Sequence, residues 1–256
     1  MTIHHPPLRY HGSKWRLAPW IIAQFPPHRL YCEPFAGGAS VLLRKSPSEV
    51  EIYNDLDGRI VNFFRVAREH PTALMTQLLL TPYARAEAIT DREPAEDDPL
   101  EDARRVCAAS WMLFGGGQGQ WHTGFRVQRP SSANNTSDLW AKLPLQLPAV
   151  AARLRRVQIE NLPALECIRR YDAPETLFYV DPPYLQSTRS KWRKTAYRHE
   201  TTDDDHKQLA QVLHGIKGMA ILSGYPSDLY CRLYNNWHMI ETTTRTDRGK
   251  AVTECL

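Results

Sequence analysis

The sequence has few cysteines and no long apolar run. Its 256 residues include five scattered cysteines without a Cys-x-x-Cys pair, so we expect neither structural zinc nor a disulfide framework. A membrane span needs about eighteen consecutive uncharged apolar residues, and no stretch approaches that length. The first residues also lack the apolar core of a signal peptide. We therefore expect a protein of the cytoplasm with no membrane partner.

The net charge is also small. A formal charge of +4 and a pI of about 8.8 mean that a nucleic-acid partner must be inferred from local clusters and not from the total. With 42% hydrophobic and 23% charged residues, the chain can bury a substantial core, either as one domain with an insertion or as two small domains.

The tetrapeptide Asp181-Pro182-Pro183-Tyr184 is the most distinctive stretch. It follows an apolar run at 177–180 that reads as a strand, and open α/β sheets bind ligands at the carboxyl ends of their strands. The prolines fix the backbone, so the Asp181 carboxylate and the Pro182 carbonyl could accept both hydrogens of an exocyclic amine while Tyr184 stacks on its base. The amine lone pair would be free to attack a methyl group. Alternatively, the two prolines only stop the strand.

The stretch Glu33–Ser40 predicts a ligand-binding turn. It contains two adjacent glycines and lies between an expected strand at 30–32 and an expected helix through 41–43. Glycine lets a ligand approach the backbone closely, and the amino end of a helix attracts anions. The turn does not have the Gly-x-Gly-x-x-Gly pattern of dinucleotide enzymes.

Asp55 is the expected partner of this turn. It follows a strand at 50–53 and lies 18 residues after Gly37, near the spacing at which a doubly wound sheet places a carboxylate against ribose hydroxyls. Turn and carboxylate together predict an adenosine pocket; the alternative is a helix cap.

Two further positions are candidates for the same pocket. Lys14, at the start of the first expected helix, would present a cation to a ligand carboxylate. Asn161 and Leu162 follow an expected strand at 157–160 and could hold an adenine ring, although Asn161 could equally cap a helix.

Residues 71–154 are expected to form an insertion. Acids and prolines at 91–99 predict an exposed loop, and a helix is expected from 100 to 114. The glycine-rich stretch that follows could read base edges or could be a flexible surface loop. Its candidate DNA contacts are Gln118, Gln120, Trp121, His122 and Arg126.

A basic stretch follows the tetrapeptide. Between Ser187 and His199 there are five arginines or lysines, two aromatic residues and no acid, which predicts a loop that contacts DNA phosphates; a solvated loop is the alternative. The candidate contacts are Arg189, Lys191, Arg193, Tyr197 and Arg198. The acids at 203–205 with His206 precede a helical pattern, so we expect them to cap a helix and not to bind a metal.

In the order of these motifs the chain resembles the DNA adenine methyltransferases of the Dam type. The resemblance covers nearly the whole chain and rests on Tyr10–Lys14, Glu33–Ser40, Asn54-Asp55 and Asp181–Tyr184. It implies S-adenosylmethionine as the cofactor and catalysis by Asp181, Pro182 and Tyr184. The cofactor residues that it implies are Tyr10, Lys14, Glu33, Phe35, Gly37 and Asp55.

We therefore predict an α/β fold with a Rossmann-like, mostly parallel sheet from residues 1–70 and 155–256, interrupted by a mostly helical target-recognition insertion at 71–154. The expected reaction methylates the N6 amine of adenine in double-stranded DNA after the base is flipped out. It needs no metal and no covalent nucleophile. Two alternatives stay open: methylation of the N4 amine of cytosine, and an inactive module that only binds nucleic acid. The sequence does not reveal whether the protein has a companion restriction endonuclease or what its oligomeric state is.

Overall fold

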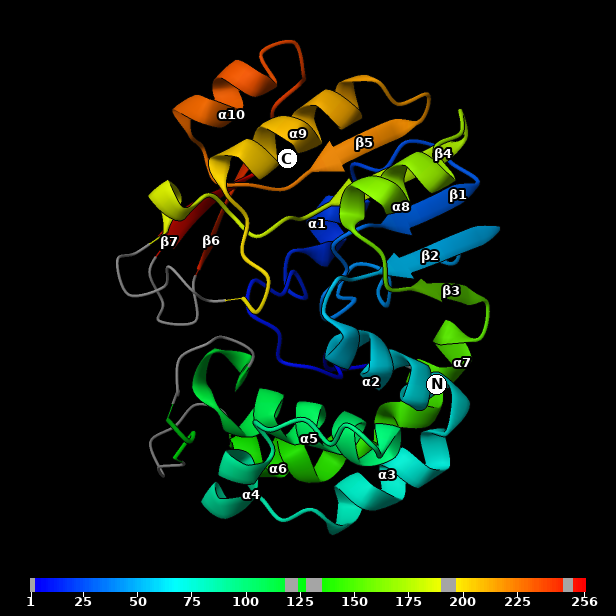
Figure 1. The fold of residues 1–256 in the computed structure, drawn as a ribbon, viewed down its shortest axis with the longest axis vertical. Coiled ribbons are helices and arrows are strands. Elements are labelled where there is room, and N and C mark those ends of the chain that lie inside the picture. Colours follow the sequence, from blue (N-terminus) through cyan, green and yellow to red (C-terminus); the bar gives the residue numbers. More distant parts are fainter. Residues whose placement is uncertain (1–2, 118–123, 128–134, 190–196, 246–250) are drawn as a thin grey trace.

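A sheet of five parallel strands forms the centre of the molecule (Figure 1). The structure is a computed structural model that describes residues 3–117, 124–127, 135–189, 197–245 and 251–256. The strand order is β3-β2-β1-β4-β5, and the α/β prediction with its expected strands is confirmed. The strands are β1 (Leu30–Glu33), β2 (Val50–Asn54), β3 (Val157–Glu160), β4 (Thr176–Val180) and β5 (Met219–Leu222).

Strand β1 lies at the point where the strand order reverses. Cys32 pairs with Ile52 of β2 on one side and with Phe178 of β4 on the other. The carboxyl ends of these three strands therefore meet, and in open α/β sheets ligands bind in the crevice at such a switch point. The register brings Glu33, Asp55 and Asp181 to one edge of the sheet.

Alternating side chains of the strands enter two hydrophobic clusters, as expected for a strand period of two. Cys32, Ile52 and Phe178 pack with helices α8 (Ala164–Tyr171) and α9 (Asp203–His214) on one face. Tyr31, Tyr53, Leu177 and Tyr179 face the other cluster, which also contains buried residues of α1 (Ala18–Ile22) and α2 (Gly58–Glu69). Helices thus cover both faces of the sheet (Figure 1).

The prediction of a helix through residues 41–43 is wrong. The connection between β1 and β2 is a series of turns, in which Leu43 N–H donates to Ala39 (3.0 Å) and the N–H groups of Arg44 and Lys45 both donate to Val41 (3.0 and 2.9 Å). Ala39 has a φ of +53°, which a right-handed helix does not contain. The apolar run is buried without helical periodicity, so its hydrophobicity alone misled the prediction.

The segment at 71–154 is mostly helical, and it lies along one side of the sheet (Figure 1). Its helix α5 packs on α2, and both contribute to the same hydrophobic cluster, so this segment shares its core with the sheet. Its elements are α3 (Pro71–Leu80), α4 (Arg85–Thr90), α5 (Pro99–Met112), η1 (Phe114–Gly117), α6 (Thr136–Lys142), η2 (Leu143–Gln146) and α7 (Leu147–Leu154).

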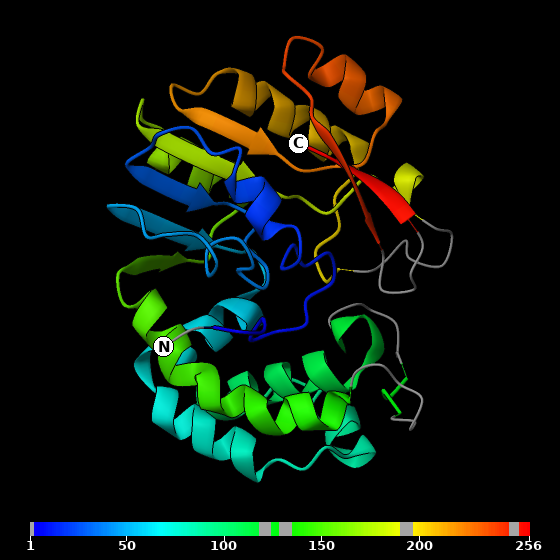
Figure 2. The ribbon, with the colours of Figure 1, turned by 180° about the vertical axis from the view of Figure 1, so that it is seen from behind.

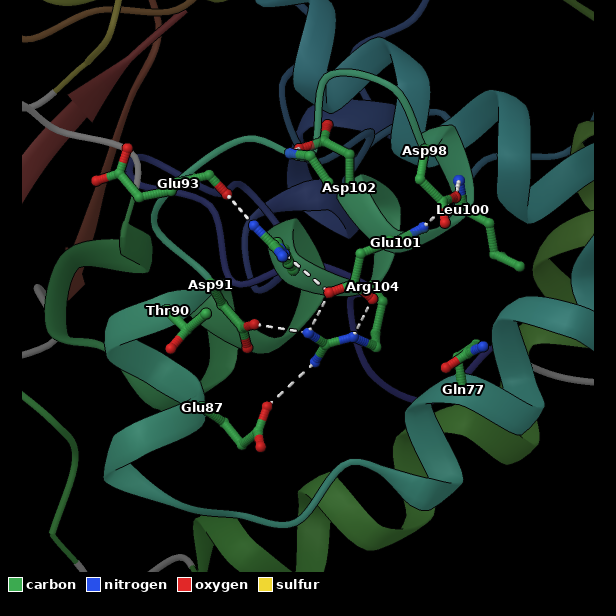
Figure 3. Close-up of polar contacts among 12 residues, drawn as sticks. Gln77, Glu87, Thr90, Asp91, Glu93, Asp98, Leu100, Glu101, Asp102 and Arg104 are labelled. Carbon is green, nitrogen blue, oxygen red and sulfur yellow. Dashed lines mark hydrogen bonds and ion pairs between the residues drawn. The ribbon is translucent and has the colours of Figure 1, made fainter.

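The loop at 91–99 is partly or fully exposed from its second residue on, in agreement with the prediction, but its first residue is not. Asp91 is completely buried and lies 2.8 Å from Arg104 of α5, which also binds Glu101 and approaches Glu87 (Figure 3). A buried guanidinium requires counter-charges, and Arg104 obtains one by drawing the start of the loop inward.

A two-stranded antiparallel hairpin, β6 (Glu241–Arg245) and β7 (Ala251–Cys255), ends the chain. The N–H of Cys255 donates to the Gly224 carbonyl (2.9 Å) and the reverse bond is 3.1 Å, so β7 is fastened to the loop after β5. The hairpin therefore lies beside the end of β5 (Figure 2). Two short elements, η3 (Gln186–Thr188) and α10 (Asp228–Leu233), complete the fold. None of the helices within the described ranges is long and apolar enough to cross a membrane.

Candidate active site

A cavity of about 570 Å³ lies at the carboxyl ends of β1, β2 and β4. This is within the range of roughly 300–1,000 Å³ that is usual for small-molecule sites. It brings together most of the residues that the sequence proposes for catalysis and cofactor binding. Those that line it are Tyr10, Lys14, Glu33, Phe35, Gly37, Asp55, Asp181, Pro182 and Pro183.

Asp55 organises the glycine turn. Its Oδ2 accepts the N–H of Gly37 and its Oδ1 accepts the N–H of Asp57, both at 2.8 Å. Gly37 has a φ of +47°, and a Cβ there would lie 2.8 Å from the ring of Tyr10, so both its conformation and its packing require glycine. Burial raises the pKa of Asp55 to about 6. Each carboxylate oxygen keeps a second lone pair, so Asp55 can still accept a ligand hydroxyl.

Glu33 is a second buried carboxyl group in this wall. It ends β1, is 2% exposed and accepts the hydroxyl of Tyr31 at 2.7 Å. Burial raises the pKa of Glu33 to about 7. A cationic ligand group beside it would stabilise the ionised form.

The sequence suggested that Lys14 would present its charge to a ligand carboxylate. In the structure, Lys14 is instead paired with carboxylates of the protein. Its Nζ lies 2.9 Å from Asp181 Oδ1 and 3.5 Å from Glu254 Oε1, and it donates to the Gly12 carbonyl at 3.0 Å. Burial alone would lower the pKa of Lys14, but the carboxylates of Asp181 and Glu254 raise it above its ordinary value. Lys14 is therefore a buried cation shared by two acids.

Asp181 is the carboxylate nearest to this cation. Burial raises the pKa of Asp181, and the charge of Lys14 opposes that rise. Its Oδ1 is buried and, despite the ion pair, makes no bond of hydrogen-bond geometry with the residues that the structure describes. Each carboxylate oxygen has two lone pairs, so Asp181 can accept further bonds beside its ion pair with Lys14.

Tyr184 does not line the cavity. Its hydroxyl donates to the carboxylate of Glu254 in β7, and its ring meets Tyr225 edge-on with centroids 4.7 Å apart. Lys14 Nζ lies 4.7 Å from the centroid of the same ring. Sequence analysis missed Glu254, because a single acid in a short terminal strand has no local motif that points to the tetrapeptide.

A chain of hydrogen bonds holds the tetrapeptide backbone. The hydroxyl of Thr201 donates to the Pro183 carbonyl (2.8 Å) and also contacts His206 Nε2 (3.1 Å), while His206 Nδ1 contacts the hydroxyl of Tyr230 (3.0 Å). Since Thr201 uses its proton on Pro183, His206 donates from Nε2 and accepts at Nδ1. Burial lowers the pKa of His206, in keeping with this neutral form.

The start of α9 agrees with the prediction that its acids cap a helix. Thr202 is the N-cap, and its side chain exchanges hydrogen bonds with Asp205 in a capping box. Within the described residues, no three His, Cys, Asp or Glu side chains are grouped so that they could hold a metal ion.

Of the basic stretch that we predict to contact DNA phosphates, residues 190–196 lie outside the described ranges. Arg189 is 6% exposed and lies 2.7 Å from Glu200, so the structure does not present its guanidinium to DNA. Tyr197 lines the cavity and packs edge-on against His11, with centroids 5.1 Å apart. Arg198 is 45% exposed and lies 3.5 Å from Asp57.

The remaining candidate DNA contacts are only partly described. Arg126 donates from Nε to the Leu113 carbonyl at 2.8 Å, and its guanidinium lies 5.1 Å from the centroid of Phe114. The other candidates lie outside the described residues: Gln118, Gln120, Trp121, His122, Lys191 and Arg193.

Asn161 and Leu162 border the cavity without lining it. Asn161 donates from Nδ2 to the Asp55 carbonyl at 2.7 Å, and the Leu162 N–H donates to the side chain of Asn54 at 2.8 Å. Both residues tie the end of β3 to the end of β2. The helix-cap alternative for Asn161 is wrong, because Pro163 occupies the N-cap of α8. Apolar residues that sequence analysis missed form the wall here: Pro163, Ala164 and Leu165.

Comparison with known protein families gives one match. The family model of the D12 class N6 adenine-specific DNA methyltransferases matches residues 10–94 and 131–247. The matched segments contain the glycine turn, Asp55 and the tetrapeptide, whereas Glu254 lies beyond them. A separate search among curated proteins found no match to the chain.

Proposed function

The chain belongs to the D12 class N6 adenine-specific DNA methyltransferase family, and we propose that its cavity holds S-adenosylmethionine while Asp181 receives an adenine flipped out of the duplex. The family acts on the N6 amine of adenine in DNA, which favours adenine over the N4 amine of cytosine. We place its action in the cytoplasm. A restriction endonuclease that cuts the same site when unmethylated would be a natural companion.

The chemistry of the cavity wall fits the cofactor. S-adenosylmethionine carries a cationic ammonium and a cationic sulfonium, and three buried or partly buried acids line the cavity: Glu33, Asp55 and Asp181. Apolar side chains at Phe35 and Leu165 offer surfaces for an adenine ring. We assign Asp55 and the glycine turn to the nucleoside and Glu33 to the ammonium.

The observation that carries the proposed mechanism is the position of Asp181 at the carboxyl end of β4, in the same cavity as Asp55 and the glycine turn. When bound, the cofactor supplies the electrophilic methyl group. Asp181 accepts one N–H of the adenine amine and the Pro182 carbonyl accepts the other, which orients the nitrogen lone pair. The ionised Asp181 also stabilises the positive charge that develops on this nitrogen and can take up its proton.

The stacking role of Tyr184 is part of the proposal. Its ring adjoins Lys14, which pairs with Asp181, so a base bound at Asp181 would lie near the ring. Since a base inside a duplex cannot reach a carboxylate in the wall of a cavity, the proposal requires base flipping.

Analysis of the reaction product tests the function. Purified protein is incubated with S-adenosylmethionine and unmethylated mixed-sequence duplex DNA, and the DNA is digested to nucleosides for mass spectrometry. We expect N6-methyladenine from the wild type and at least about a hundredfold lower single-turnover rate from Asp181→Ala, with cofactor binding retained.

Glu49→Ala is the matched control, because Glu49 is an exposed acid at the opposite end of the sheet that pairs with Arg29. It should leave the rate unchanged. N4-methylcytosine as the product, or an Asp181→Ala variant with the wild-type rate, would contradict the proposal.

A further inference from the structure

Four side chains from three separate parts of the chain meet at the cavity: the buried Lys14 and Glu254 and the partly buried Asp181 and Tyr184. Glu254 bonds the Tyr184 hydroxyl and lies 3.5 Å from Lys14, which in turn lies 2.9 Å from Asp181. Glu254 itself makes no part of the cavity wall. Glu254 therefore contacts Tyr184 of the tetrapeptide and Lys14, the ion-pair partner of Asp181, without lining the cavity.

The hairpin places this carboxylate rigidly. Glu254 pairs with Thr242 of β6, and the next residue, Cys255, is bonded in both directions to Gly224. Side chains alternate along a strand, so Thr253 is exposed while Glu254, only 3% exposed, points inward. A buried acid costs free energy unless it is paired, and its partners here are Tyr184 and Lys14.

Resting on the function proposed above, we propose that Glu254 is a positioning residue for methyl transfer, which fixes the ring of Tyr184 and draws Lys14 partly away from Asp181. Without Glu254 the ring of Tyr184 loses the bond that fixes its far end, and the stacking surface for the flipped base becomes mobile. Misplacement by about 1 Å is enough to cost roughly a hundredfold in rate.

The second consequence concerns the lysine. Lys14 has three N–H donors, and the structure divides its charge between Asp181 and Glu254. If Glu254 were neutral, Lys14 would bind Asp181 alone and compete with the adenine amine for the same oxygens. Glu254 thus preserves the acceptor capacity of Asp181 without touching the substrate.

The test separates these effects with four variants. Glu254→Ala removes both contacts, Glu254→Gln keeps an acceptor for Tyr184 but removes the charge, Tyr184→Phe removes only the hydroxyl, and the Glu254→Ala/Tyr184→Phe double variant completes a cycle. Glu241→Gln is the matched control, because Glu241 is an exposed acid on the same hairpin. Each protein is examined for thermal unfolding, S-adenosylmethionine affinity, single-turnover methyl transfer and fluorescence of 2-aminopurine at the target adenine.

We expect Glu254→Ala and Tyr184→Phe each to lower the single-turnover rate by about ten- to a hundredfold, with cofactor Kd within about threefold of the wild type. The double variant should be no slower than Glu254→Ala, because that change already removes the partner of the Tyr184 hydroxyl. Glu254→Gln should be intermediate, and 2-aminopurine fluorescence should show a less ordered flipped base in Tyr184→Phe.

Additive losses in the double variant, or wild-type rates in both Glu254→Gln and Tyr184→Phe, would overturn the assignment. The second criterion applies even if Glu254→Ala fails to fold, since the other two changes are nearly isosteric. An inactive wild type would instead reject the proposed function, so the two failures are distinguishable.

Discussion

The carboxyl group of Glu33 predicts a pH dependence of cofactor binding. Burial raises its pKa to about 7, above the ordinary 4.5, so the group is largely protonated at pH 6 and largely ionised at pH 8. If the ionised form pairs with the ammonium of S-adenosylmethionine, affinity must fall as pH falls through 7. The change Glu33→Gln removes the titrating group at nearly constant shape.

The expected magnitude follows from the fraction of ionised Glu33. With a pKa of about 7, this fraction rises about tenfold from pH 6 to pH 8, so Kd should fall about tenfold, equivalent to about 1.4 kcal/mol. At pH 7, where about half of the Glu33 groups carry a proton, binding should release about half a proton per cofactor.

Isothermal titration calorimetry at pH 6, 7 and 8 measures the Kd, and buffers of different ionisation enthalpy report the proton release. The comparison of wild type with Glu33→Gln cancels any titration of the cofactor and of Asp55. Glu49→Gln, at an exposed site, should behave as the wild type. The same pH dependence in Glu33→Gln would refute the assignment of Glu33 to the ammonium.

Two further predictions concern the glycine turn and the buried arginine. Gly37→Ala should raise the cofactor Kd at least about tenfold, because a φ of +47° strains alanine by about 1–2 kcal/mol and its Cβ would lie 2.8 Å from the Tyr10 ring. In calorimetry Gly58→Ala, whose Cβ meets its nearest atom at 3.5 Å, should bind normally, and an unchanged Kd in Gly37→Ala would contradict this account of the turn. Arg104→Met should lower the free energy of unfolding in urea by about 3–5 kcal/mol, because it leaves Asp91 buried and unpaired. The half-exposed pair of Arg170 and Glu166 provides the control Arg170→Met, which should cost less than about 1 kcal/mol; equal losses would show that Asp91 needs no counter-charge.

Sequence patterns predict the sheet well because the information is local. The runs that become β1, β2 and β4 are short, apolar and bounded by breakers, and the switch-point rule then gathers Glu33, Asp55 and Asp181 without further data. The assignments that were wrong, or that the sequence missed, depend on distant partners. Glu254 meets Tyr184 from 70 residues away along the chain, and no sequence window of ordinary length contains both.

The ion-pair partners of charged side chains are equally hard to predict from the sequence. Lys14 and Arg189 are cations in sequence contexts that suggest ligand contacts, yet each is paired with a buried or half-buried acid. A pattern of charges predicts that a cation will be satisfied, but only the fold determines which anion satisfies it. The helix prediction for residues 41–43 was wrong for a related reason: a short, buried apolar run can be either a helix or a series of packed turns.

The contact between Lys14 and Glu254 also has a consequence for synthesis of the protein. Glu254 follows Lys14 and all five strands of the sheet in the sequence, so the strands that form the cavity can pair before the second carboxylate is made. Until β7 docks on the loop that contains Gly224, Lys14 can pair with Asp181 but not with Glu254. The nascent chain can therefore form the sheet and the glycine turn early, whereas the geometry around Tyr184 is completed only after β7 has left the ribosome.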